Sequence, residues 1–245
     1  MNRDELIFYA VKYRGDYNKV LCAIHNQEKM IVKYNVNAIT ILDEDYPECL
    51  KDLKYPPFVL FYKGNKNLLK ENMVAVVGSR LPCEYAIRAT TILVDKLKVN
   101  HVIVSGLAKG IDGVAHRASI DARTIGILGC GIDYVYPKEN IDLFDEMSSN
   151  HLILSEYPSK ELPYPNHFPF RNRIIAALVN DVYVMQSSLK SGTLITVNEA
   201  LSINRNVYAL PYDIFSKEGE GTNMLIQEGA NMILLKDIRD NKLQL

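Results

Sequence analysis

The sequence offers few groups for building a metal site or a disulfide framework. Its cysteines are scattered and no two of them form a CxxC pair; they are Cys22, Cys49, Cys83 and Cys130. We therefore expect neither structural zinc nor disulfide bonds, and these spacings fit a reducing, cytoplasmic setting.

Long apolar runs are also missing. No stretch approaches the roughly 18–20 apolar residues that a membrane-spanning helix needs. The opening residues, MNRDELIFYAVKYRGD, contain neither a long apolar core nor a small-residue cleavage site. We therefore expect no secretory signal and no membrane partner.

Positive charge is not in excess. Lys and Arg total 28 against 29 Asp and Glu, which gives a formal net charge of -1. This balance excludes a polybasic tail and a histone-like nucleic-acid binder, but it leaves room for a local cationic pocket. The composition, 48% hydrophobic and 23% charged, is ordinary for a globular protein and allows one large domain with a small appendage.

Residues 1–54 are predicted to form a small helical N-terminal domain. Asp16 can cap a helix whose apolar residues, from Tyr17 to Ile24, recur at helical spacing on one face. The segment is too small to bury much surface alone, so we expect it to pack against the rest of the chain. Two consecutive prolines in KYPPFVLFYKGN then interrupt helix formation before an apolar strand.

Residues 55–245 are predicted to form one α/β domain. Short apolar runs alternate with helical patterns, such as those at 85–97 and 194–201. Such runs are typical of strands buried on both faces of a parallel sheet. The runs are MVAVVG (73–78), HVIVSG (101–106), TIGILG (124–129), DVYVMQ (181–186), NVYALP (206–211) and NMILL (231–235). The pattern predicts a doubly wound, mostly parallel sheet.

Glycine and polar residues concentrate directly after these strands, where ligands bind in such sheets. Glycines let backbone amides approach an anion, and a following helix N-terminus adds its positive end. The segments are Gly78-Ser79-Arg80, SGLAKGID (105–112), GCGIDYVYP (129–137), and Ser187 and Ser188 with the SGT of residues 191–193. Each alone is compatible with a plain tight turn, but together they favour an anionic ligand.

The familiar nucleotide-binding motifs are absent. Gly78 does not begin a GxGxxG fingerprint, and the sequence contains no Walker GxxxxGK[ST] motif. Hydride transfer and ATP hydrolysis therefore lose their usual support.

Residues 162–180, LPYPNHFPFRNRIIAALVN, combine arginines and aromatic rings with no acidic residue. The prolines predict an extended first half. Such a segment suits single-stranded nucleic acid, because cations follow the phosphates and rings stack on unpaired bases. The alternative is a loop whose aromatic residues fill the core and whose Arg171 and Arg173 form salt bridges within the fold.

Taken in order, these motifs resemble the DprA/Smf family (DNA-processing protein A). The match covers about residues 55–235 and runs through YPPFVLFYKGN, GSR, SGLAKGIDGVAH, TIGILGCGIDYVYP, SEYP, FPFRNRIIAAL, SGTLITVNEAL, VYALP and GTNMLIQEGA. The resemblance implies an extended Rossmann-like fold that binds single-stranded DNA without obvious sequence preference. It also implies a homodimer that protects incoming DNA, displaces single-strand-binding protein and helps to load the RecA recombinase in natural transformation.

The same resemblance implies the site residues. A cationic pocket would contain Arg80 and Lys109, and the FPFRNR segment would supply Phe168 for stacking together with Arg171 and Arg173. Further phosphate or base contacts would come from Gly78, Ser79, Ser105, Gly106 and Asn223, and the dimer surface would lie around Leu225 and Ile226. The family pattern implies no cofactor, metal or catalytic residue. Two departures from it are Gln186, where glutamate is usual, and Tyr212, where glycine is usual.

Several residues leave catalysis to be weighed against structure. His116 can be a general base, but no nucleophile is identifiable beside it, and a packing role is favoured. Asp112 and Asp133 follow strand ends, where they can ligate a metal, although Asp112 can equally cap the next helix. Cys130, between two glycines, has the pattern of a small buried residue rather than a reactive thiol.

Two other functions compete with DNA binding. A LOG-type nucleotide phosphoribohydrolase needs a glutamate three residues after a threonine; Thr193 matches the threonine, but Thr196 stands at the glutamate position and Glu199 lies one helical turn further. A small-nucleotide sensor would use the same strand ends without the Arg171 and Arg173 segment.

Overall fold

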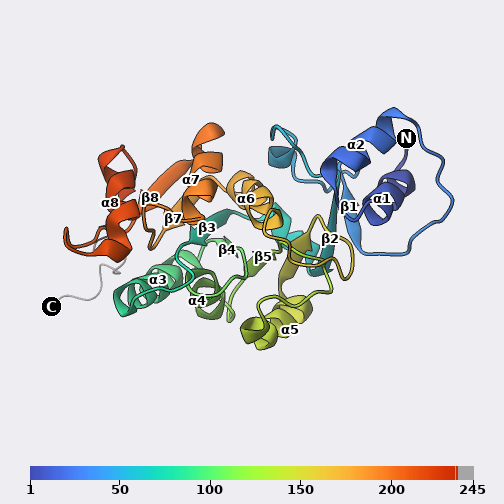
Figure 1. The fold of residues 1–245 in the computed structure, drawn as a ribbon. Helices are drawn as coiled ribbons and strands as arrows, with labels where there is room; N and C mark the ends of the chain where they lie inside the picture. Colours follow the sequence, from blue (N-terminus) through green and yellow to red (C-terminus); the bar gives the residue numbers. More distant parts are fainter. Residues whose placement is uncertain (235, 237–245) are drawn as a thin grey trace.

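A nine-stranded sheet runs through the described part of the protein, residues 1–234 and 236, in this computed structural model (Figure 1). The strand order is β1-β2-β6-β5-β4-β3-β7-β8-β9. All neighbours from β6 to β9 pair in parallel, whereas β1 and β2 are antiparallel additions at one edge. The strands are β1 (Ala38–Thr40), β2 (Val59–Gly64), β3 (Met73–Val77), β4 (Val102–Ser105), β5 (Thr124–Ile127), β6 (Leu152–Ser155), β7 (Asp181–Val184), β8 (Asn206–Ala209) and β9 (Asn231–Met232).

Helices cover both faces of this sheet (Figure 1). One face packs against α3, α4 and α5, and the other against α6, α7 and α8, as the separate core clusters on the two sides show. The helices are α1 (Arg3–Lys12), α2 (Tyr17–His25), α3 (Glu84–Leu97), α4 (Ile111–Ala118), α5 (Ile141–Asn150), α6 (His167–Ala177), α7 (Thr193–Ser202) and α8 (Glu220–Gln227). Short 3-10 helices are η1 (Glu48–Leu50), η2 (Lys66–Lys70), η3 (Lys138–Asn140) and η4 (Lys217–Gly219). The predicted doubly wound α/β fold is confirmed.

The apolar runs identified in the sequence form strands β3, β4, β5, β7, β8 and β9. The central strands β4 and β5 are buried at every position, as expected for strands covered on both faces. The last run extends to residue 235, which lies outside the described residues, as do residues 237–245 of the second predicted domain. No helix within the described residues is long and apolar enough to cross a membrane.

The N-terminal region adds to the same sheet. Asp16 caps α2 as predicted, because its carboxylate accepts a hydrogen bond of 3.1 Å from the Lys19 backbone N–H. The region is not purely helical, since β1 pairs with β2 and places Ala38 opposite Phe61. The boundary predicted at residue 54 thus falls between two strands that hydrogen-bond to each other.

Besides β1, the elements α5, β6 and α8 were also missed in the sequence. Strand β6 is the apolar run LILS, which is fully buried between β2 and β5, and α5 precedes it directly. The run has the same signature as the six strands that were recognised. The local sequence was therefore sufficient to indicate a strand, and the pairing with β2 and β5 shows it.

The first half of the 162–180 segment is also less extended than predicted. Helix α6 already begins at His167, and Pro169 is its third residue. The first turn of a helix has no intrahelical acceptor for its N–H groups, so a proline there costs no hydrogen bond. The segment is extended only before this helix.

The direction in which the chain adds strands to the sheet changes at β3. From β3 the chain winds outwards through β4 and β5 to β6, and α6 then carries it back to β7, on the other side of β3. The carboxyl ends of β3 and β7 therefore flank the topological switch point, where open α/β sheets bind their ligands.

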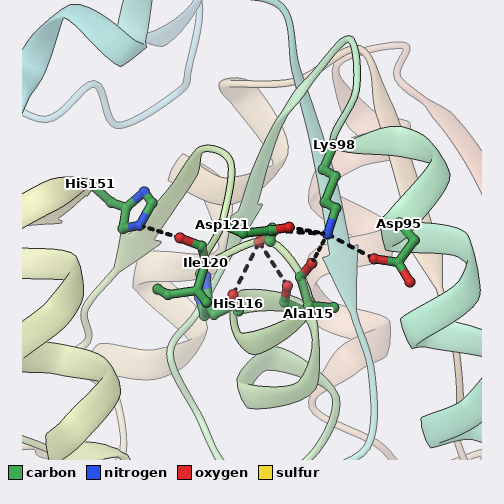
Figure 2. Close-up of polar contacts among 9 residues, drawn as sticks. Asp95, Lys98, Ala115, His116, Ile120, Asp121 and His151 are labelled. Atoms are coloured by element: carbon green, nitrogen blue, oxygen red, sulfur yellow. Dashed lines mark hydrogen bonds and ion pairs between the residues drawn. The ribbon is translucent and has the colours of Figure 1, made fainter.

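A polar cluster holds the turn after α4 (Figure 2). Lys98, at the end of α3, donates to the Ala118 carbonyl at 2.9 Å and forms ion pairs of 2.8 Å with Asp95 and Asp121. His151 bonds to the Ile120 carbonyl at 3.0 Å from the other side. The turn is thus tied to two neighbouring elements.

His116 lies inside this cluster and is fully buried. The Thr124 hydroxyl donates to the Ile103 carbonyl, so it accepts from His116 Nδ1, 2.7 Å away. The other ring nitrogen has no hydrogen-bond partner among the described residues. Burial, with a smaller contribution from His151, lowers the pKa of His116 to about 3. His116 is therefore a neutral structural residue, which agrees with the packing role favoured from the sequence.

This burial predicts acid sensitivity. Because unfolded His116 binds a proton near pH 6.5 and folded His116 does not, the free energy of unfolding should fall below about pH 6.5, by up to about 1.4 kcal/mol per pH unit. Urea unfolding at about pH 7 and about pH 4.5 measures this loss. A His116→Gln variant, whose amide can still donate to Thr124, should show a shallower pH dependence; an identical one would contradict the assignment.

Candidate nucleic-acid interface

A cavity of 580 Å³ opens at the switch point, beyond the carboxyl ends of β3 and β7. We call it the first cavity. The loop after β3 and the loop before α7 form two of its walls, and the segment leading into α6 forms a third. Its lining includes Gly78, Ser79, Arg80, Asp112, Tyr136, Pro163, Pro165, Phe168, Pro169, Arg171, Ser188, Lys190, Ser191, Gly192, Thr193 and Thr196. All four predicted strand-end segments therefore contribute to one site.

The first cavity is cationic. Arg80, Arg171 and Lys190 line it, against Asp112 as the one carboxylate in its described lining. Arg80 and Lys190 are exposed, and neither has an ion-pair partner among residues 1–234 and 236. Their charges remain available to an anion that enters the cavity.

Phe168 stands at the wall of this cavity with its ring partly exposed. The Arg80 guanidinium carbon lies 5.4 Å from the ring centroid, and the Tyr136 ring centroid lies 5.6 Å away. Gly129 makes room for the ring, because a Cβ there would lie 2.7 Å from a Phe168 ring carbon. The predicted cation and the predicted stacking ring are thus side by side.

Arg171 forms part of the inner wall of the cavity, with only 4% of its surface exposed. Its Nη1 donates to the Gly106 carbonyl at 2.7 Å and also to the Ile127 carbonyl. A Cβ on residue 106 would lie 2.6 Å from both Arg171 Nη2 and Asp112 Oδ2, so only glycine leaves room for this pair. Burial raises the pKa of Asp112, and the Arg171 charge opposes that rise. Arg171 therefore holds α6 onto the ends of β4 and β5.

Arg173 points away from the first cavity. It forms a buried, bidentate ion pair with Glu156, with N–O distances of 2.7 and 2.6 Å, and it also donates to the Tyr55 carbonyl at 2.8 Å. Its guanidinium carbon lies 3.7 Å from the Phe170 ring centroid. The salt bridge that the sequence left as an alternative is present, and Arg173 is not positioned to bind a phosphate.

Two further predicted contacts lie near the cavity without lining it. Ser105 is buried, and its hydroxyl donates to the Val76 carbonyl at 2.6 Å. Lys109 is half-exposed and forms an ion pair with Glu139. Ser105 therefore positions the strand ends, and an anion that engages Lys109 must compete with Glu139.

Asn223 and the predicted dimer residues lie on α8, apart from this cavity. The Asn223 side chain accepts from the Tyr212 N–H at 2.9 Å and donates to the Tyr212 carbonyl at 3.1 Å. Leu225 is buried in the core with 5% of its surface exposed, and Ile226 packs against the same core. The structure does not bring these residues together with Arg80 and Phe168.

The two departures from the family pattern have local explanations. Gln186 accepts from the Cys83 N–H at 2.9 Å and donates to the Leu81 carbonyl, and a glutamate could not make the second bond. Gln186 thereby braces the loop that begins with Arg80. The Tyr212 hydroxyl donates to the Met185 carbonyl at 2.8 Å, so this residue fills space between strand ends.

The other titratable candidates are engaged within the fold. Asp133 forms an ion pair of 2.7 Å with Lys63, which lowers the pKa of Asp133. Cys130 is buried, and burial raises the pKa of its thiol to about 12. Within the described residues, no cluster of three His, Cys, Asp or Glu side chains is arranged to hold a metal ion.

Several lining residues were missed by sequence reasoning, among them Lys190, Tyr136 and Asn172. Tyr136 stands inside the marked segment GCGIDYVYP, so that segment was an available signal. Lys190 lies between the marked Ser188 and Ser191, and its position in the chain was the only signal for it. Thr196, at the position where a LOG-type hydrolase has its glutamate, lines the first cavity as a hydroxyl, and the hydrolase is not favoured.

Comparison with known proteins decides the family. The model of the DNA recombination-mediator protein A family matches residues 37–242. The chain belongs to this family. The DNA processing protein DprA of Bacillus subtilis is 44% identical over 202 residues, which cover 81% of this chain and 68% of that protein. DprA of Streptococcus pneumoniae is 44% identical over 198 residues, which cover 80% of this chain and 70% of that protein.

Solved structures of DprA proteins share the fold. An X-ray structure of DprA from Streptococcus pneumoniae superposes with a TM-score of 0.80 at 36% identity and covers 94% of this chain and 89% of that one. A DprA structure from Helicobacter pylori, which was described together with that protein's single-stranded DNA binding mode, gives a TM-score of 0.75 at 33% identity and covers 82% and 92%. The resemblance inferred from the sequence motifs is confirmed.

The Arg173–Glu156 pair yields a stability prediction for this DprA-family chain. Arg173→Met leaves the Glu156 carboxylate buried without its partner, which should cost about 3–5 kcal/mol in the free energy of unfolding. Urea unfolding measures the loss. The double variant Arg173→Met/Glu156→Leu should recover much of it, because neither charge then remains buried. An Arg173→Met protein as stable as the parent would show that the pair is not structural.

Proposed function

We propose that this protein binds single-stranded DNA in the first cavity as a recombination mediator. The observation that supports this best is the pairing of an unneutralised cation, Arg80, with a partly exposed ring, Phe168, at the switch point of the sheet. A cation attracts the phosphates of a single strand, and an exposed ring stacks on its unpaired bases. The family assignment and the DNA binding described for the Helicobacter pylori protein support the same interpretation.

The lining residues divide into two groups in this proposal. Arg80 and Lys190 contact phosphates, and Phe168 stacks on a base. Arg171 stays in its network of backbone carbonyls, where its charge adds to the positive potential of the inner wall. Arg173 is left out of the contact set, and Lys109 joins it only if it exchanges Glu139 for a phosphate.

The proposal is binding rather than catalysis. The carboxylate in the cavity, Asp112, is buried beside Arg171, and the His116 imidazole is enclosed under α4 with its Nδ1 committed to Thr124. A small-nucleotide sensor would use one phosphate group and one base. The match of residues 37–242 to the DNA recombination-mediator protein family supports DNA as the ligand instead.

The proposal includes three protein partners: the RecA recombinase, single-strand-binding protein and a second copy of this chain. A recombination mediator in natural transformation would hand its DNA to the RecA recombinase and displace single-strand-binding protein. A homodimer would help, because two cavities on one strand raise the effective concentration of the second contact. Since Leu225 is buried, Ile226 and its exposed neighbours on α8 would form the dimer contact. Sedimentation with and without an oligonucleotide tests this; a strict monomer in both would exclude it.

The cations predict the salt dependence of binding. For single strands, log affinity falls with log salt at a slope of about −0.7 per neutralised phosphate, so two or three cations give about −1.4 to −2 rather than the −3 expected from four. Arg80→Ala and Lys190→Ala should each weaken binding and make the slope shallower by about 0.7. Anisotropy titrations over a salt series measure both quantities.

Arg88→Ala is the matched control, because Arg88 is an exposed arginine on α3 that does not line the cavity. It should change neither affinity nor slope. Unchanged binding by both Arg80→Ala and Lys190→Ala would remove the first cavity from consideration.

Phe168 predicts a preference for unpaired bases. Phe168→Ala should weaken single-strand binding by about 1–3 kcal/mol while leaving the salt slope unchanged, because a ring contributes stacking and no charge. Duplex of the same sequence should bind the parent protein less well, since paired bases cannot reach the ring. Competition titrations with single strand, duplex and mononucleotide make the comparison; equal affinity for single strand and duplex would contradict the stacking role.

A further inference from the structure

A second cavity of 660 Å³ lies between the N-terminal helices and the segment that leads into α6. The turn between α1 and α2 forms one side of it, including Arg14, Asp16 and Tyr17. The other side comes from Tyr55 and from the stretch between Glu161 and Phe170. Part of its lining belongs to the 162–180 segment, but the function proposed above does not use this cavity.

The two cavities share a wall. Along the segment 163–170, Pro163, Pro165, Phe168 and Pro169 line the first cavity, whereas Tyr164, Asn166, His167 and Phe170 line the second. Up to Asn166, the side alternates from one residue to the next, as it does in an extended chain. A strand that passes over this segment can therefore reach the second cavity from the first.

The second cavity is aromatic. The Tyr17 ring centroid lies 5.4 Å from that of Tyr55 and 6.1 Å from that of Phe170, in edge-to-face contacts. The rings of Tyr164 and His167 meet in the same way at 5.3 Å. Tyr55 and Tyr164 keep 40% and 42% of their surface exposed, so their ring surfaces are not used up by packing within the fold.

The cations that line this cavity are paired, and one further cation, Lys54, lies outside the lining with its Nζ 5.2 Å from the Tyr55 ring centroid. Arg14 lies 3.9 Å from Glu161, and Lys19 lies 3.5 Å from Asp16, so each cation of the lining has a carboxylate beside it. The first cavity, by contrast, has unneutralised Arg80 and Lys190. A lining of exposed rings with paired charges suits nucleobases better than it suits phosphates.

We propose that the second cavity is a base-stacking subsite for the same single strand, with Tyr55 and Tyr164 as its stacking rings. The subsite rests on the function proposed above and deepens it. The first cavity holds phosphates and one base, and bases further along the strand stack in the second. The N-terminal helices thereby take part in binding long single strands.

The test uses the full chain and fluorescein-labelled oligothymidylates of about four and about sixteen nucleotides, which span the range of site sizes known for single-strand binders. The double variant Tyr55→Ser/Tyr164→Ser should bind the long oligonucleotide at least about fivefold more weakly than the parent. Its affinity for the short one and its salt slope should not change. The matched control, Tyr55→Phe/Tyr164→Phe, keeps both rings and should bind both lengths like the parent.

A long oligonucleotide that carries abasic residues in one half removes bases while keeping phosphates. It should bind the parent as weakly as the intact strand binds the serine variant. Equal binding of the intact long strand by the serine variant and the parent would overturn the subsite and leave the first cavity intact. Weaker binding of the short strand by the serine variant would also overturn it, because the tyrosines would then support the first cavity. If the parent binds neither the short nor the long strand, the proposed function itself fails.

Discussion

The guanidinium of Arg171 fastens helix α6 to the ends of two central strands by donating to the carbonyls of Gly106 and Ile127. Helix α6 is the crossover that brings the chain back from β6 to β7, so its position decides where the residues before it stand. Phe168 lies one turn earlier on the same helix and meets Arg80 from the loop after β3. The wall of the first cavity depends on this buried cation, whose carbonyl partners and neighbouring Asp112 replace the water that burial removes.

Arg171 and Arg173 serve different purposes because they lie on a helix. In an extended chain, residues two apart point to the same face, and both arginines would line one groove. In an α-helix they are about 200° apart. One guanidinium therefore reaches the strand ends and the other reaches Glu156 and Tyr55. The pair fixes α6 from two sides, towards the sheet and towards the N-terminal region.

The near-neutral net charge and the cationic cavity are compatible because charge is sorted in space. Elsewhere on the surface, many cations are matched with acids, as in Lys66–Asp45, Lys33–Asp4 and Lys98–Asp121. Arg80 and Lys190 have no such partners among the described residues, and both line the same cavity. Unmatched cations that converge at the switch point attract a phosphate chain more strongly than cations scattered over the surface.

The order of apolar runs and turns in the sequence was sufficient to predict the doubly wound sheet, because strands buried on both faces leave a continuous apolar signal and their carboxyl ends must share one edge. The motif order pointed to the family, and Arg80 and Phe168 were named from it. The tertiary structure decided which side chains remain free to bind a ligand. Glu156, seventeen residues before Arg173, neutralises that arginine, and Glu139 pairs with Lys109. The backbone of Tyr212 hydrogen-bonds to the Asn223 side chain. Tyr55 came to lie beside Phe170 only because α6 packs against the N-terminal region. Such pairings join residues far apart in the chain, and no local pattern records them, because they result from the crossing of helices and strands in space.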